Sequence, residues 1–112
     1  MCREEAIKVL GEVHEGVSEI LPVPIHDAYL YGSYARGDYT KESDIDILLT
    51  VDLDWPEISA YRSAVSRLVS DLCLKYDVTV SVTFAPVKLF VQFAEDLPFY
   101  RNVMTEGLRY VA

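Results

Sequence analysis

Apolar residues recur at helical spacing along the first segment of the chain. Between residues 3 and 21 they step by three and four, at Ala6, Val9, Leu10, Val13, Val17, Ile20 and Leu21. This spacing gathers them on one side of a helix. Pro22 and Pro24 follow at once, and proline does not continue a helix. The pattern therefore predicts an amphipathic helix over residues 3–21 that presents one face to a core.

Three shorter segments have the composition of strands. Residues 28–31 form an apolar run, and residues 44–51 form a second one that is rich in β-branched side chains. Runs of this length and kind favour strands. Residues 77–84 alternate strictly between apolar and polar, which predicts a strand with one polar face. The polar positions of that strand are Asp77, Thr79, Ser81 and Thr83.

The remaining apolar positions predict three more helices. Residues 58–72 carry an amphipathic pattern after Pro56, which suits a first helical turn. Shorter helices are predicted over residues 86–95 and 98–106. The order of elements predicts one α/β domain over residues 1–112, in which a small mixed sheet is covered by helices.

Composition narrows the class of protein. The 112 residues leave room for about one domain, so we expect an enzyme of this size to take part of its site from a partner. Ten basic against 18 acidic residues give a net charge of -8, which opposes binding to nucleic acid. We expect no membrane association, because no apolar run approaches the roughly 18 residues of a membrane span. Cys2 and Cys73 show no metal or redox spacing, which together with the lack of a signal peptide suggests a reduced cytoplasmic protein.

The first candidate for chemistry is the pair Gly32-Ser33, directly after the predicted strand 28–31. Gly32 permits a sharp turn and a close approach of the backbone to a ligand, and Ser33 can cap a following helical turn. Free backbone N–H groups at such a turn suit an anion, notably a phosphate. Arg36 lies within the turn and can pair with a phosphate or with Asp38. Taken alone, a Gly-Ser pair is more often a plain turn.

The second candidate is the acidic pair Asp44 and Asp46, at the head of the predicted strand 44–51. Side chains alternate along a strand, so both acids project from one face while Ile45 and Ile47 project from the other into the core. Two rises of about 3.3 Å place the acids about 7 Å apart at the backbone, close enough to share a divalent cation. For this motif alone, the plainer interpretation, with both carboxylates in water at a strand edge, stays open.

Together the two features match a known arrangement. A nucleoside triphosphate bound to Mg²⁺ needs N–H groups for its phosphates and oxygen ligands for the metal. Gly32-Ser33, ten further residues and then Asp44-Ile45-Asp46 resemble the signature of the DNA polymerase β-like nucleotidyltransferase superfamily. Residues 31–49 resemble, more narrowly, the minimal nucleotidyltransferases of the MntA type.

This resemblance implies a nucleotidyltransferase fold and a two-metal transfer of AMP from ATP to a hydroxyl. Gly32 and Ser33 would hold the triphosphate, and Arg36 is a further candidate for binding the nucleotide. Asp44 and Asp46 would bind Mg²⁺ as catalytic ligands. The acceptor hydroxyl would attack the α-phosphate, and pyrophosphate would leave.

The superfamily usually adds a third carboxylate on a neighbouring strand, which helps to bind the catalytic metal. The predicted strand 77–84 is the candidate, and Asp77 is its only acid. Asp77 has the right parity but lies at the start of the strand, whereas Ser81 stands where the third acid would fall. Either Asp77 serves as the third catalytic metal ligand, or the set of acids is incomplete and the chemistry is slow or absent.

Three functions follow for such a chain. Proteins that resemble MntA act with a helical HEPN-type partner, the HepT toxin, and the resemblance implies that they neutralise it by adding AMP to a partner tyrosine. We therefore expect the antitoxin of a toxin–antitoxin system. A catalytically degenerate binding module, which neutralises its partner by occlusion, is the alternative. Nucleotide transfer to a small molecule is the third, and it would need a second copy of the chain to enclose the substrate.

Overall fold

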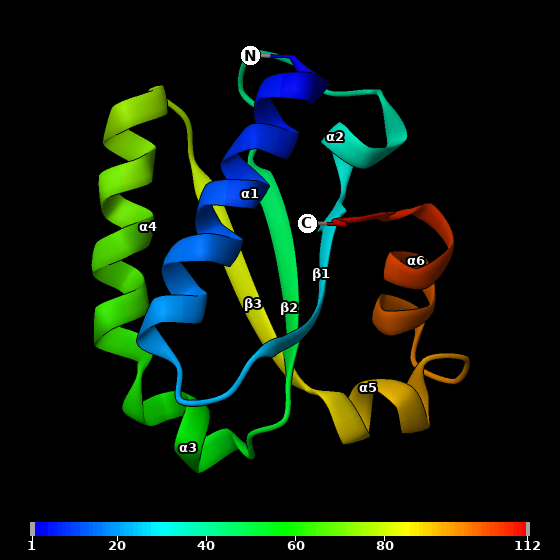
Figure 1. Ribbon diagram of the computed structural model, residues 1–112. Coiled ribbons are helices and arrows are strands. Elements are labelled where there is room, and N and C mark those ends of the chain that lie inside the picture. Colours follow the sequence, from blue (N-terminus) through cyan, green and yellow to red (C-terminus); the bar gives the residue numbers. More distant parts are fainter. Residues whose placement is uncertain (1, 112) are drawn as a thin grey trace.

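The computed structural model describes residues 2–111 as a four-stranded sheet with helices packed on both of its faces (Figure 1). In chain order, the helices are α1 (Arg3–Ile20), α2 (Ser33–Arg36), α3 (Trp55–Ala60), α4 (Arg62–Tyr76), α5 (Val87–Phe93) and α6 (Pro98–Glu106). The strands are β1 (Ile25–Tyr31), β2 (Ile45–Val51), β3 (Val80–Pro86) and β4 (Leu108–Arg109). The predicted α/β class is confirmed.

The sheet is mixed, as predicted. Its strands lie in the order β3-β2-β1-β4. β1 runs antiparallel to β2 and to β4, whereas β2 runs parallel to β3. The parallel pair is joined through α3 and α4, since parallel neighbours need a crossover connection. β3 and β4 are the two edge strands, and Figure 1 shows β3 on the outer side of β2.

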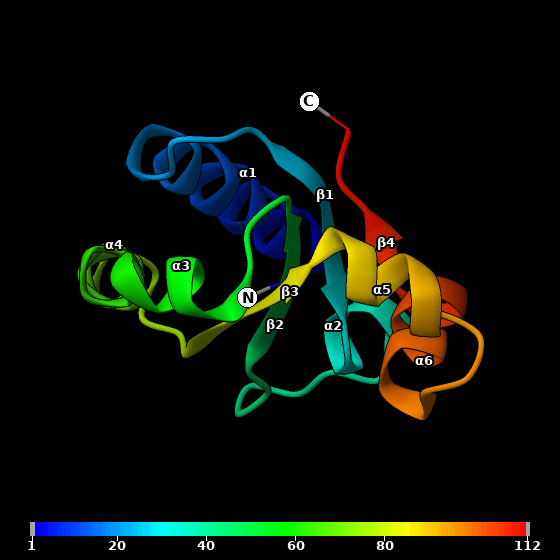
Figure 2. The ribbon, with the colours of Figure 1, turned by 90° about the horizontal axis from the view of Figure 1, so that it is seen from below.

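One face of the sheet packs against α1 and α4 (Figure 2). The buried side chains of α1 are Ala6, Val9, Leu10, Val13 and Val17, which confirms the predicted helical face. Ile45, Ile47 and Leu49 of β2 are fully buried on the same side. Burial of an apolar side chain of this size contributes about 1.5–3 kcal/mol, so this core holds β2 firmly.

α5 and α6 cover part of the opposite face. The buried residues of this second core are Tyr29, Leu48, Ala85, Phe90 and Val103. β2 is therefore buried on both sides, and a slip of one residue would exchange the two sets of side chains. Asp46 lies on the same face as Leu48, two residues earlier along the strand. The direction of Asp46 is thus fixed by the packing of its neighbours.

The predicted helix 58–72 is in fact two helices. α3 begins earlier, at Trp55, where the carboxylate of Glu57 accepts the backbone N–H of Asp54 at 3.1 Å. The chain leaves helical geometry at Tyr61 (φ -101°, ψ 0°) before α4 starts. The apolar spacing continues across this break, which is why the pattern indicated a single helix.

The predicted strand 77–84 begins three residues later, at Val80, so the placement of Asp77 on its polar face is wrong. Asp77 is the C-terminal cap of α4 and adopts a left-handed conformation (φ 50°). Val78 in the following connection packs against the first core. Its alternation with the polar residues on either side imitates a strand, although the backbone there is still leaving the helix.

The sequence did not predict β4. This short strand pairs with β1, and the guanidinium of Arg109 donates to the carboxylate of Asp27 at 2.8 Å. β1 also begins earlier than predicted, at Ile25. Among the described residues, no helix is both long and apolar enough to cross a membrane.

Candidate active site

Gly32 brings the predicted phosphate turn into contact with Asp46, one of the two predicted metal ligands. It lies between β1 and α2 with φ 76° and ψ -153°, a backbone conformation that favours glycine. A Cβ at this position would stand 2.5 Å from Oδ2 of Asp46. The carboxylate of Asp46 therefore lies directly against the backbone of Gly32.

α2 is a single helical turn after this glycine. The backbone N–H groups of Ala35 and Arg36 both donate to the carbonyl of Gly32, at 3.1 Å. The first N–H groups of a helix have no acceptor within the helix, and here they belong to Ser33 and Tyr34. Backbone N–H groups in this position suit an anion such as a phosphate, and they point from the same turn that contacts Asp46.

Arg3 fixes α2 in place, and the sequence analysis did not find it. From the first turn of α1, its guanidinium donates to the carbonyls of Tyr34 at 3.0 Å and Ala35 at 2.8 Å. Tyr34 is almost fully buried and its ring stacks on that of Tyr39, with centroids 4.5 Å apart. The turn is therefore held by hydrogen bonds and by packing, on the side away from the acids.

Asp44 and Asp46 occupy different environments. Asp44 directly precedes β2 and is exposed, whereas Asp46 lies within β2 and is partly buried. Burial, and in smaller part the charge of Asp44, raise the pKa of Asp46, while Arg36 acts in the opposite direction. A pair of carboxylates whose mutual repulsion is only partly compensated is a suitable ligand set for a hard divalent cation such as Mg²⁺.

Arg36 makes surface ion pairs, one of which is the pair that the sequence analysis left open. Its side chain lies 3.3 Å from the carboxylate of Asp38 and 3.7 Å from that of Glu106 in α6. The side chain is 46% exposed, so these pairs are weak. The positive charge of Arg36 acts to lower the pKa of Asp46.

Ser81 occupies the position beside Asp46 on the neighbouring strand, where a third acid was sought. The two residues are register partners across β2 and β3. Asp77 is exposed at the end of α4 and lines a separate cavity with Lys41 and Ser43. Within residues 2–111, no three His, Cys, Asp or Glu side chains gather as a metal site, so Asp77 is not brought together with Asp44 and Asp46 in this way.

Tyr31 stands on the other side of Asp46 and was not singled out from the sequence. It is the register partner of Asp46 on β1, and its ring meets that of Phe99 of α6 edge to face, with centroids 5.3 Å apart. Burial is the main cause of its raised pKa, and the Asp46 carboxylate adds to the effect. Tyr31 therefore forms a wall between the acids and α6.

The comparison with known families agrees with this geometry. Residues 10–110 match the nucleotidyltransferase domain family, and the chain belongs to that family. The family and the enzyme class that the sequence predicted are thereby confirmed.

Two relatives come from Methanocaldococcus jannaschii. "Putative protein adenylyltransferase MJ0141" is 31% identical over 96 residues, which cover 86% of this chain and 95% of the relative. "Putative protein adenylyltransferase MJ0604" is 44% identical over 78 residues, which cover 70% of each protein.

Solved structures share the fold. A crystal structure described as a toxin–antitoxin with AMP-PNP aligns with a TM-score of 0.53 at 23% identity, over 97% of this chain and 72% of the other. A mutant of the toxin–antitoxin MntA-HpeT aligns with a TM-score of 0.51 at 21% identity, again over 97% and 72%. At these identities the likeness concerns the fold alone.

The contact between Gly32 and Asp46 predicts a selective effect of a methyl group. In Gly32→Ala, the new Cβ displaces the Asp46 carboxylate, so we expect Mg²⁺-dependent binding of ATP to weaken at least about tenfold. Gly37→Ala is the matched control, because Gly37 also has a positive φ (93°) but its Cβ would approach only the Arg3 guanidinium. Isothermal titration with Mg-ATP measures both variants, and equal losses would contradict the prediction.

The raised pKa of Asp46 predicts a cost in stability. A carboxyl whose pKa rises on folding favours the folded state below that range, and this advantage is lost as the pH rises through it. Without metal at neutral pH, Asp46→Asn should therefore melt at a higher temperature than the wild type, and the difference should vanish at acidic pH. Calorimetry in chelator tests this, with the exposed Asp52→Asn as control. A lower melting temperature for Asp46→Asn would be inconsistent with it.

Proposed function

We propose that this chain is a Mg²⁺-dependent protein adenylyltransferase that moves AMP from ATP to a hydroxyl of a partner protein. The carrying observation is the contact of Asp46 with Gly32, which sets a carboxylate ligand beside a turn of backbone N–H groups. A nucleoside triphosphate with its metal presents the complementary pair of charges. The names of the two relatives from Methanocaldococcus jannaschii support a protein as the acceptor.

The proposed roles follow from position. The N–H groups of Ser33 and Tyr34 hold the terminal phosphates, and Asp44 and Asp46 are the metal ligands. Bound Mg²⁺ would neutralise the charge that develops on the phosphate oxygens. The bond from the acceptor oxygen to the α-phosphorus forms as the bond from the α-phosphorus to the bridging oxygen breaks. The proton of the acceptor hydroxyl passes to water, and pyrophosphate leaves with its charge against α2. The positive charge of Arg36 would favour the negative charge of the leaving pyrophosphate.

We propose a helical HEPN-type toxin, similar to HepT, as the partner, with a tyrosine hydroxyl as acceptor. The toxin–antitoxin structures that share the fold support this choice, and one of them is described with AMP-PNP. Addition of AMP would place a bulky anion on the toxin, and the chain would thereby act as an antitoxin.

A second candidate function is neutralisation by contact alone. One observation favours it: among the described residues, no third acid joins Asp44 and Asp46, and Ser81 stands in the cross-strand position. A chain that acts in this way would neutralise its partner without using nucleotide.

A transfer assay separates the two functions. The purified chain, the HEPN-type partner and Mg-ATP are incubated, and the partner is examined by intact-mass spectrometry for added AMP. Asp46→Asn should reduce the transfer rate at least about 100-fold, because the loss removes a metal ligand from the reacting phosphate. Asp52→Asn, which changes an exposed acid beyond the opposite end of β2, should transfer at the wild-type rate.

Removal of divalent metal with chelator should stop the wild-type reaction, and added Mg²⁺ should restore it. If Asp46→Asn neutralises the toxin as fully as the wild type and neither protein modifies it, contact alone is the function.

A further inference from the structure

The outer edge of β3 has backbone groups that no other strand within residues 2–111 uses. The carbonyl of Thr79 accepts the N–H of Ile45 in β2 at 2.9 Å, whereas the N–H of Val80 donates in the other direction, to Sγ of Cys73 in α4 at 3.3 Å. Successive residues of a strand direct their backbone groups to opposite sides. The residues of β3 therefore face β2 and the outside in turn.

Val82 and Phe84 have the same parity as Val80. Their N–H and C=O groups accordingly point away from β2, on the edge where the described part of the chain provides no further strand. Both side chains are only partly buried. Edge groups of this kind are a template for pairing with another chain.

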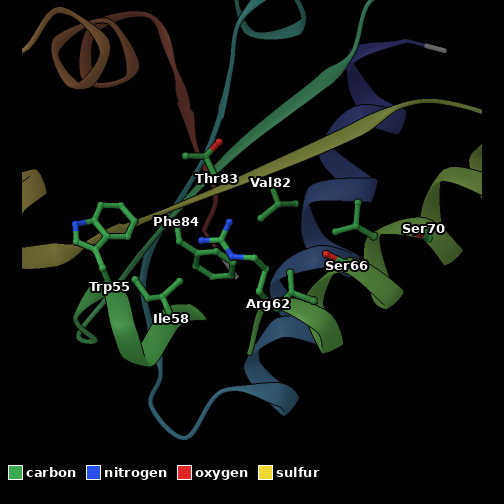
Figure 3. A pocket seen from close by; sticks show the side chains of 10 residues that line it. Trp55, Ile58, Arg62, Ser66, Ser70, Val82, Thr83 and Phe84 are labelled. Carbon is green, nitrogen blue, oxygen red and sulfur yellow. The ribbon is translucent and has the colours of Figure 1, made fainter. Parts of the chain in front are cut away.

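A cavity of about 500 Å³ lies along this part of the edge (Figure 3). Val82 and Phe84 line it from β3, Trp55 and Ile58 line it from α3, and Val65 lines it from α4. The wall combines apolar side chains with a half-exposed tryptophan. An extended peptide that paired with β3 would place alternate side chains against this surface.

A positively charged side chain, that of Arg62, also lines the cavity. Arg62, Ser66 and Ser70 follow at steps of four along α4, so they form one stripe on the side that faces the cavity. Figure 3 shows the guanidinium of Arg62 extending into the space between α4 and β3. Among the described residues, no ion pair occupies Arg62. In a chain of net charge -8, this position favours a carboxylate of the bound segment.

The outer edge of β3 also leads toward the acids. Asp44 directly precedes β2 and Asp46 lies within it, and Ser81 of β3 is the register partner of Asp46. The cavity lies further along the same strand, at residues 82–84. A segment that binds along this edge past Ser81 would bring an acceptor hydroxyl toward the acids.

We propose that the acceptor protein binds through an extended segment that adds as a strand to the free edge of β3, with an acidic side chain of the segment paired to Arg62. This docking rests on the proposed function for its partner. It accounts for the unused backbone groups, the apolar wall and the guanidinium of Arg62, and it uses the strand that runs beside Asp46 at Ser81.

Hydrogen exchange measured by NMR tests the docking directly. In the chain alone, the amides of Val82 and Phe84 should exchange faster than those of Ser81 and Thr83, which face β2. Addition of the purified HEPN-type partner should slow exchange at Val82 and Phe84 about tenfold or more. A complex in which these two amides exchange at the free rate would overturn the proposal.

Two charge reversals provide a matched comparison. Arg62→Glu should weaken binding of the partner at least about tenfold, since it sets like charges against each other in the groove. Arg67→Glu makes the same change at another exposed position of α4, outside the cavity, and should leave affinity within about twofold. Equal effects of the two substitutions would contradict a specific role for Arg62.

Asp46→Asn separates docking from catalysis. This variant should keep the protection of Val82 and Phe84 while it loses transfer. Protection by a wild-type chain that transfers no AMP would leave the docking intact and refute the proposed function. Transfer of AMP without protection of these two amides would support the proposed function and refute the docking.

Discussion

The contact between the Asp46 carboxylate and the backbone of Gly32 is the constraint on which the site depends. It leaves no room for a Cβ at residue 32, and it holds a partly buried acid next to a turn of N–H groups. The environment of the acid opposes its charge, as the raised pKa shows. An acid with a raised pKa that lies against a glycine turn is a candidate functional residue.

The rest of the fold keeps this contact in register. β2 inserts Ile45 and Ile47 into one core and Leu48 into the other, so Asp46 cannot turn away without moving a fully buried neighbour. On the other side of the contact, Arg3 binds two carbonyls of α2 and ties the turn to the first helix. Long-range hydrogen bonds and two cores thus position a site whose own residues are few.

The sequence was sufficient to predict the features that follow from a repeating pattern of apolar and polar residues. The period of two in β2 predicted the face of Asp46, and the helical spacing of α1 predicted its buried side, because each pattern is a local consequence of backbone geometry. It failed at Asp77, where a helix cap followed by Val78 imitates the alternation of a strand.

The sequence analysis missed the role of Arg3 and the strand β4 for a different reason. Their partners lie far along the chain, at Tyr34 for Arg3 and at Asp27 for Arg109. No local pattern signals an interaction over such a separation. The same limit applies to Tyr31, whose position beside Asp46 follows from strand register alone.

The residues on the β1 side of the acids differ from those on the β3 side, and this difference bears on the choice of acceptor. Toward β1 lie the turn that begins at Gly32, the guanidinium of Arg3 that fixes it and the ring of Tyr31. Toward β3, Ser81 lies beside Asp46, and the outer edge of β3 pairs with no other strand among the described residues. A hydroxyl that arrives with its own backbone aligned to that edge loses its freedom of approach before the reaction, whereas a free small molecule or water does not. With the proposed docking, recognition of the acceptor and catalysis on it would depend on the same strand, so that transfer would favour a protein hydroxyl over water or a small molecule.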